Sequence, residues 1–208
     1  MIFIYLHGFA SSPASRKAQF FAAKLRERGV EVEVPYLEAE GFRNLTVTGQ
    51  LKVIEECARG RAARLIGSSM GGYLAALYAS LHPETERLVL LAPAFGFASR
   101  WSLRLGEEKM AEWRERGEIQ MTHYGTGKPE AIGYELIEDG MRYPAEPDFA
   151  QPALIFHGSG DDVVPLSFSE DFVRTRPNVR LTTMASGHEL TDVMEEMWTR
   201  SEEFLLTK

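Results

Sequence analysis

Cysteine is nearly absent from this sequence, because Cys57 is the only one among 208 residues. A single thiol cannot form a disulfide within the chain, which argues against a disulfide-stapled secreted scaffold. Cys57 lies in a helical pattern, where a small packing residue is expected rather than a nucleophile. A basic surplus is also missing, since 30 acidic residues outnumber 23 Lys and Arg and give a formal charge of −7. We therefore expect neither a nucleic acid nor a membrane as partner.

Long hydrophobic runs are missing as well, and none approaches the roughly 18 residues that a membrane span needs. Residues 1–6 are apolar but carry no basic residue before them and no small-residue cleavage site, so they predict a strand rather than a signal peptide. The share of hydrophobic residues, 44%, and of charged residues, 25%, is typical of globular proteins. We expect a single domain over residues 1–208 and a cytoplasmic location.

Short apolar segments recur along the chain, and several lack polar alternation. This pattern is typical of strands that are covered on both faces, as in a parallel sheet. Because amphipathic helical stretches separate them, the chain predicts an α/β fold with an open, mostly parallel sheet of about six strands flanked by helices. The predicted strands are residues 2–6, 31–34, 63–66, 87–91, 153–157 and 179–184.

Four helical stripes lie between or after these strands. Ser12 is the predicted N-cap of the first helix, with Pro13 in its first turn and Gly29 at its end. The apolar stripes are Ala18, Phe21, Ala22 and Leu25; Leu51, Ile54 and Ala58; Met70, Leu74, Leu77, Tyr78 and Leu81; and Met194, Met197, Trp198, Ser201 and Leu205. Core packing is the expected role of all four.

Residues 98–148 break the alternation of strands and helices. No sheet-like apolar run occurs over this interval, which is long for a loop in a compact domain. Residues 101–117 predict a charged helix. Alternation at Ile119, Met121 and His123, and again at Ile132, Tyr134 and Leu136, predicts a hairpin. We expect a lid or cap insertion over the carboxyl edge of the sheet; the alternative is an excursion packed on the side of the domain.

The strongest chemical motif is G-x-S-x-G at residues 67–71. It follows an apolar strand and precedes a helical pattern, which is the context of a sharp strand-to-helix turn. Gly67 and Gly71 leave room for such a turn with Ser69 at its apex, whereas Ser68 is flanked at the same offsets by Ile66 and Met70. Ser69 is therefore the predicted nucleophile.

A serine hydroxyl needs a base, and the base needs an orienting carboxylate. Asp161 follows a predicted strand, and His188 follows the last one, which gives the order Ser, Asp, His expected for this type of sheet. Asp162 is the alternative acid, and the offset of Asp161 from the strand end favours it. His157 is the alternative base, but its place four residues before the acid suits a structural role in the turn.

The oxyanion of acyl transfer needs hydrogen-bond donors. The backbone N–H of Met70, directly after the nucleophile, is one candidate, and that of Phe9, after the first strand and beside Gly8, is the second. Signatures of other chemistries are missing: the chain has no H-E-x-x-H, no paired cysteines and no phosphate-binding glycine loop. We predict no cofactor and no metal. His82 and His123 have no identifiable partner.

Taken together, these motifs resemble those of the α/β-hydrolase superfamily over nearly the whole chain. The residues that carry the resemblance are 5–9, 67–73, 91–94, 157–165 and 187–188. More narrowly, residues 6–13 with Ser15, Lys17 and Ala18 resemble the small bacterial esterases called YqiA-type. The superfamily's full sheet has two further strands before the first one here, so a smaller sheet is expected.

The resemblance implies a Ser-His-Asp esterase with Ser69, His188 and Asp161 as triad and the Phe9 and Met70 amides as oxyanion hole. A small acyl ester or thioester is the expected substrate. An amide or peptide hydrolase with the same triad is the second interpretation, and a ligand-binding protein that kept the fold is the third. The sequence does not specify the oligomeric state.

Overall fold

A six-stranded parallel sheet forms the centre of the molecule. The computed structural model describes residues 1–207, and the strand order is β2-β1-β3-β4-β7-β8. Every neighbouring pair in this sheet is parallel. All six predicted strands are present, so the predicted fold class is confirmed. The strands are β1 (Ile2–Leu6), β2 (Val32–Glu33), β3 (Ala63–Ser68), β4 (Arg87–Leu91), β7 (Ala153–Gly158) and β8 (Val179–Met184).

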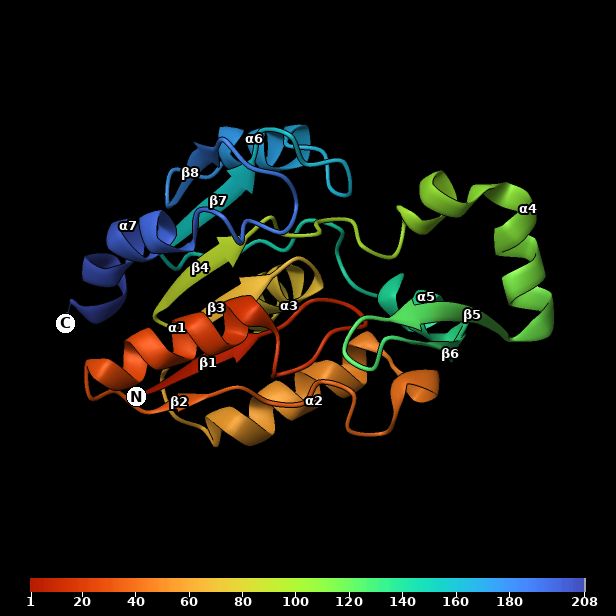
Figure 1. Ribbon diagram of the computed structural model, residues 1–208, viewed down its shortest axis with the longest axis horizontal. Coiled ribbons are helices and arrows are strands. Elements are labelled where there is room, and N and C mark those ends of the chain that lie inside the picture. Colours follow the sequence, from red (N-terminus) through yellow and green to blue (C-terminus); the bar gives the residue numbers. More distant parts are fainter. Residues whose placement is uncertain (208) are drawn as a thin grey trace.

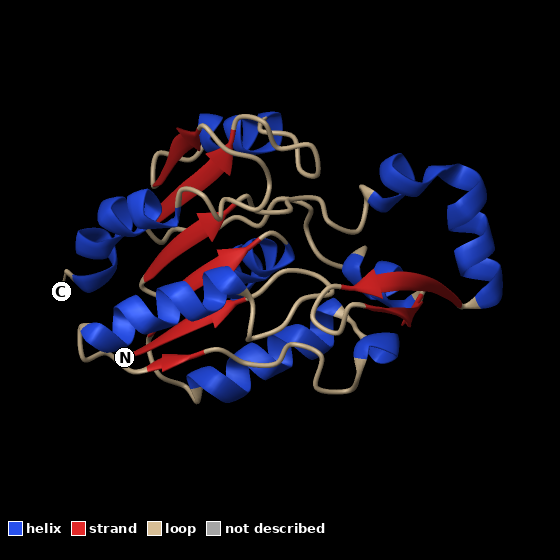
Figure 2. Ribbon diagram, in the orientation of Figure 1, coloured by secondary structure: helices blue, strands red, loops and turns tan. Residues whose placement is uncertain are grey.

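Helices cover both faces of the sheet, as Figures 1 and 2 show. In β1, Phe3 and Tyr5 join a core with the helices α1 (Arg16–Glu27) and α7 (Met194–Leu206). Ile2, Ile4 and Leu6 point to the opposite core, which contains α2 (Val47–Ala58), α3 (Met70–Leu81) and Phe172 of α6 (Ser167–Arg174). Because successive side chains of a strand alternate between faces, this two-sided cover explains strands without polar alternation.

Two helix predictions need correction. α3 is buried on all sides from Met70 to Ala79 rather than along a stripe, and Leu81, a predicted stripe residue, is 55% exposed. α1 begins at Arg16 with Ser15 as N-cap, three residues later than predicted. A turn precedes it, in which the Ser15 N–H donates to the Ser12 carbonyl at 3.0 Å. α6 was not predicted at all. The buried face of α7 contains the five predicted residues.

The segment between β4 and β7 contains a helix, an antiparallel hairpin and a second, short helix. The elements are α4 (Trp101–Arg116), β5 (Glu118–His123), β6 (Lys128–Gly133) and α5 (Glu135–Gly140). β6 ends earlier than the alternation predicted, since Leu136 lies in α5, where it packs as a helical core residue. In Figure 1 this segment stands beyond the ends of the β1, β3 and β4 arrows, beside the carboxyl edge of the sheet. Its function as a lid stays a prediction.

Side-chain contacts attach the hairpin to the rest of the domain. His123, for which the sequence showed no partner, contacts the Glu38 carboxylate at 2.9 Å, and both side chains are 2% exposed. Beside it, the backbone N–H of Tyr124 donates to the carbonyl of Ala10 at 2.7 Å. The hairpin tip therefore touches the loop that follows β1.

The helices described over residues 1–207 include none with the length and hydrophobicity that a membrane span requires.

Candidate active site

Ser69 occupies the turn between β3 and α3. Its φ of +54° and ψ of −116° lie outside the usual regions for a residue with a side chain, a conformation that costs about 1–3 kcal/mol. Backbone hydrogen bonds hold it there, since its N–H donates to the Leu91 carbonyl at 2.8 Å and its carbonyl accepts from the Ala94 N–H at 3.0 Å. The turn also brings α3 against β1: a Cβ on Gly71 would lie 2.1 Å from the Leu6 carbonyl oxygen. Only glycine fits at this position.

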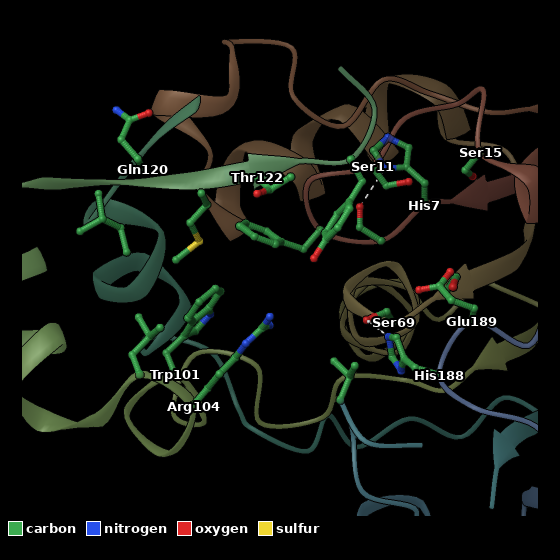
Figure 3. Close-up of a pocket in the computed structure, with 18 of the residues that line it drawn as sticks. His7, Ser11, Ser15, Ser69, Trp101, Arg104, Gln120, Thr122, His188 and Glu189 are labelled. Atoms are coloured by element: carbon green, nitrogen blue, oxygen red, sulfur yellow. Dashed lines mark hydrogen bonds between the residues drawn. The ribbon is translucent and has the colours of Figure 1, made fainter. Parts of the chain in front are cut away.

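The structure brings Ser69, His188 and Asp161 together, as Figure 3 shows for the first two. His188 Nε2 lies 3.1 Å from Ser69 Oγ, and His188 Nδ1 lies 2.8 Å from Asp161 Oδ2. The three residues follow β3, β8 and β7, whose carboxyl ends meet at one edge of the parallel sheet. The loops of the acid and the histidine are tied directly, since the Gly160 N–H donates to the Ser186 carbonyl at 3.0 Å.

Asp161 is held as a carboxylate. Its side chain is fully buried, which by itself raises the pKa, but hydrogen bonds from His157, His188 and the Val164 N–H hold the pKa of Asp161 well below its usual range. The Val163 and Val164 N–H groups donate to Oδ1 at 2.9 and 2.7 Å. The neighbouring Asp162 is exposed and contacts neither histidine.

The ionised acid determines the histidine tautomer. Because a carboxylate only accepts hydrogen bonds, His188 Nδ1 carries the proton of the bond to Asp161. In neutral imidazole the other nitrogen, Nε2, then presents a lone pair to the Ser69 hydroxyl. This arrangement is able to accept the hydroxyl proton.

His157, the alternative base, has a different environment. It is fully buried, with Nδ1 2.8 Å from Ser169 Oγ and Nε2 2.8 Å from the Val164 carbonyl and 3.1 Å from Asp161 Oδ2. It therefore braces the Asp161 turn, in line with the structural role that the sequence favoured for it.

The two candidate oxyanion donors flank Ser69. The backbone N–H groups of Phe9 and Met70 donate to no acceptor among residues 1–207, which leaves both free for a ligand. This loop runs close to the nucleophile, since a Cβ at Gly8 would lie 3.5 Å from Ser69 Cβ, an ordinary contact distance. The buried His7 orients this loop: its Nε2 accepts from the Leu37 N–H at 3.4 Å, so Nδ1 donates to the Gly8 carbonyl at 3.0 Å. Burial lowers the pKa of His7 and keeps it in this neutral form.

A cavity of about 1110 Å³ opens at Ser69 and His188. Its wall toward the insertion is mixed. Apolar side chains lie beside the nucleophile's loop and in the insertion, and charged ones such as Arg104, Lys109 and Arg116 lie among them; the apolar ones are Phe9, Trp101, Leu105, Ile119 and Met121. On the side of α1 the wall is polar, and it includes Ser11, Ser15, Lys17 and Glu189. Figure 3 shows Ser15 and Glu189 on one side of Ser69, and Trp101, Gln120 and Thr122 on the other. The sequence predicted no site role for Glu189, and Lys17 entered only as part of the YqiA-type resemblance, without a role.

The fold and the order of these site residues are those of the α/β-hydrolase superfamily. The chain belongs to a family described as uncharacterised, UPF0227, whose model matches residues 2–204. The predicted resemblance to the superfamily is thereby confirmed. Among functionally curated proteins, none matches the sequence.

Solved structures support the same fold. A protein from Agrobacterium vitis S4 is 24% identical, with a TM-score of 0.84 over 98% of this chain and 87% of that chain. Mouse alpha/beta hydrolase domain-containing protein 10 is 19% identical, with a TM-score of 0.80 over 98% and 89%. Est1E from Butyrivibrio proteoclasticus is 20% identical, with a TM-score of 0.79 over 99% and 86%. At these identities the likeness concerns the fold.

Proposed function

We propose that this protein is a serine hydrolase that cleaves carboxylic esters or acyl thioesters through an acyl-enzyme. The observation that carries the proposal is the hydrogen-bonded chain from Ser69 Oγ through His188 to Asp161, with contacts of 3.1 and 2.8 Å. A nucleophile, a base and an orienting acid in this relation are the parts that acyl transfer requires. The free N–H groups of Phe9 and Met70 beside the nucleophile support the same reaction.

In the first half of the reaction, Ser69 Oγ attacks the carbonyl carbon and its proton passes to His188 Nε2. The carbonyl electrons move onto oxygen, where the Phe9 and Met70 amides stabilise the negative charge. When this intermediate collapses, the bond to the leaving oxygen or sulfur breaks, and His188 gives its proton to that atom. The alcohol or thiol departs and the acyl group stays on Ser69.

In the second half, His188 takes a proton from water, and the resulting hydroxide attacks the acyl carbon. The bond to Ser69 Oγ breaks, the proton returns to the serine, and the carboxylic acid leaves. Asp161 keeps the imidazole in its tautomer and stabilises the imidazolium formed in each half. The sum is one ester or thioester and one water converted to one acid and one alcohol or thiol.

The relatives in structure agree with this substrate class. Est1E, 21% identical over the whole of this chain, is described with ferulic acid bound. Ferulic acid is a carboxylic acid, the type of product that ester hydrolysis releases. The apolar side chains of Trp101, Leu105 and Met121 in the cavity support binding of an uncharged acyl chain beside Ser69.

The proposal is tested with a chain-length series of p-nitrophenyl esters and acyl thioesters, measured for wild type, Ser69→Ala and the neighbouring Ser68→Ala. We expect turnover that peaks at one acyl length and falls by about 10⁴-fold or more in Ser69→Ala, with the residual rate from the oxyanion hole. Ser68→Ala should keep most of the rate. Full activity in Ser69→Ala would refute the assignment, and turnover of amides alone would favour a peptide or amide hydrolase.

A further inference from the structure

The N-terminus of α1 forms one wall of the active-site cavity. Because α1 starts after the carboxyl end of β1 and runs back along the sheet, its first residues Ser15, Arg16 and Lys17 line the cavity (Figure 1). The N–H groups of Arg16, Lys17 and Ala18 donate to no acceptor within residues 1–207. The Ser15 side chain does not cap the helix either. Free amides at a helix start attract anions, since the helix dipole is positive there.

Lys17 adds a charged group at the same place. The residue is only 9% exposed, yet within the described residues its ammonium forms neither a hydrogen bond nor an ion pair. Burial lowers the pKa of Lys17, and the carboxylates of Glu189 and Asp161 oppose this at longer range. An almost buried cation without a partner is energetically costly, so an anionic ligand would be favoured there.

Hydroxyl groups that line the same cavity also lack partners. Ser11 and Ser15 line the cavity, and their hydroxyls form no hydrogen bond among residues 1–207. The Tyr5 hydroxyl also lines the cavity; it is buried near the Ser68 side chain and has no partner at good hydrogen-bond geometry among residues 1–207. A buried hydroxyl such as that of Tyr5 normally has a partner, and together with the half-buried Ser11 and Ser15 hydroxyls it offers donors to a ligand with several acceptor oxygens.

The triad shows which part of a substrate reaches this wall. His188 must lie next to the leaving atom, because it donates the proton to that atom. Glu189 and Thr191, which follow His188 in sequence, line the cavity together with Ser15 and Lys17. In Figure 3, Ser15 and Glu189 lie on the opposite side of Ser69 from Trp101 and Arg104. The leaving group therefore extends toward α1, and the acyl chain toward the insertion.

We propose that the α1 end of the cavity is a subsite for an anionic group, a carboxylate or a phosphate, on the leaving group of the substrate. The Lys17 ammonium, the first amides of α1 and the Ser11 and Ser15 hydroxyls hold its oxygens. The assignment to the leaving group rests on the proposed hydrolase function; the anion site itself does not. Glu189 lies at the exposed rim, where solvent weakens its repulsion of the anion.

Kinetics with matched esters test the subsite. The probes are 4-butyryloxybenzoate, 4-butyryloxyphenyl phosphate and the neutral 4-butyryloxybenzamide, which share the acyl group and the ring. We expect wild type to prefer at least one anionic ester over the amide-bearing one in kcat/KM by about tenfold to hundredfold, the effect of a charge-assisted contact. Whichever anionic ester is preferred identifies the carboxylate or the phosphate as the group that the site takes.

Two variants distinguish an effect of the subsite from a general effect of positive charge in the cavity. Lys17→Met keeps the length of the buried stem and should remove most of the anionic preference. Lys109→Met, which removes an exposed lysine from the same cavity on the side of the insertion, should keep it. No preference in wild type, or an equal loss in both variants, would overturn the proposal, while hydrolysis of the neutral ester that depends on Ser69 would leave the proposed function intact.

A binding measurement tests the subsite without turnover. Calorimetric titration of Ser69→Ala with 4-hydroxybenzoate, 4-hydroxybenzamide and inorganic phosphate should show an anion that binds about tenfold or more tightly than the neutral amide. In the double variant that also carries Lys17→Met, that difference should vanish. Equal binding of the anions and the amide would refute the subsite, even if the protein is an esterase, and anion binding without any hydrolase activity would refute only the proposed reaction.

Discussion

The carboxyl edge of the sheet and the insertion hold their side chains by different means. At the sheet edge, Ser69, Asp161 and His188 follow three strands whose positions are determined by backbone pairing with parallel neighbours. In the insertion, a two-stranded hairpin pairs only with itself and is joined to the domain by contacts such as the buried Glu38–His123 pair and the Tyr124 N–H bond to the Ala10 carbonyl.

The difference suggests that the two regions have different functions. Acyl transfer needs atoms placed within a few tenths of an ångström, which the ends of packed strands provide. Substrate choice needs a surface that varies, and a segment outside the parallel sheet can change without moving the strand ends that hold the triad. We expect changes at the sheet edge to affect turnover or folding, and changes in the attachment of the insertion to affect local order and substrate binding.

The largest effect is expected at the acid. Asp161→Asn should lower kcat by about 10⁴-fold, because an amide cannot fix the histidine tautomer. Asp162→Asn, one residue further and exposed, should keep kcat within about twofold, since surface changes away from the site have little effect. Steady-state kinetics on the preferred ester decide between them. The reverse pattern would show that the acid was assigned one residue too early.

Replacing one glycine in each region compares how much the sheet edge and the insertion contribute to the stability of the fold. Gly71→Ala should lower the free energy of unfolding by about 3 kcal/mol or more, because its Cβ would overlap the Leu6 carbonyl and move α3 away from β1. Gly117→Ala, at the start of the hairpin with a φ of +74° and open space around it, should cost only about 1–2 kcal/mol of backbone strain. Urea denaturation compares the two, and equal losses would contradict the account.

The attachment of the hairpin is tested with Glu38→Ala. Removing one partner of a buried pair costs about 3 kcal/mol or more, so the amides of β5 and β6 should exchange with solvent about 100-fold faster. Amides of β3 and β4 should change little. Glu40→Ala, an exposed neighbour without side-chain contacts, is the control. Hydrogen exchange measured by mass spectrometry distinguishes this local opening from a loss of protection over the whole chain.

The smallest effect concerns pH. Because the pKa of Asp161 is lowered in the folded state, the folded protein binds that proton more weakly than the unfolded chain does. Its contribution to stability is therefore complete above the ordinary aspartate pKa of about 4 and is lost as the pH falls toward the folded value. Wild type should lose more stability than Asp161→Asn between about pH 5 and pH 2. Parallel urea midpoints over that range would contradict the shift.

Much of the sheet was predictable because its strands and the nucleophile turn are marked by patterns within short segments of the sequence. Uninterrupted apolar strands such as β1 and β4 indicate cover on both faces, and G-x-S-x-G between a strand and a helix indicates the Ser69 turn. The start of α1 was not predictable in this way. A serine before a proline suggests an N-cap, but residues 12–15 form a turn and the helix begins only at Arg16.

Contacts between segments that are distant in sequence could not be predicted from the residue pattern. Glu38 and His123 are 85 residues apart, and neither has a neighbour in sequence that indicates the pair. Lys17 belongs to the YqiA-type resemblance, but its burial beside the cavity is known only from the fold. Tertiary contacts of this kind depend on the path of the whole chain, which residue patterns alone do not determine.

The central claim, that Ser69 is a nucleophile activated by His188, is tested most directly by covalent labelling. Wild type is treated with a fluorophosphonate, and the modified peptide is located by mass spectrometry, beside Ser69→Ala and His188→Ala. The account predicts one adduct on Ser69 in wild type, none in Ser69→Ala, and labelling at least about 100-fold slower in His188→Ala. An adduct on another residue, or equally fast labelling without His188, would contradict it.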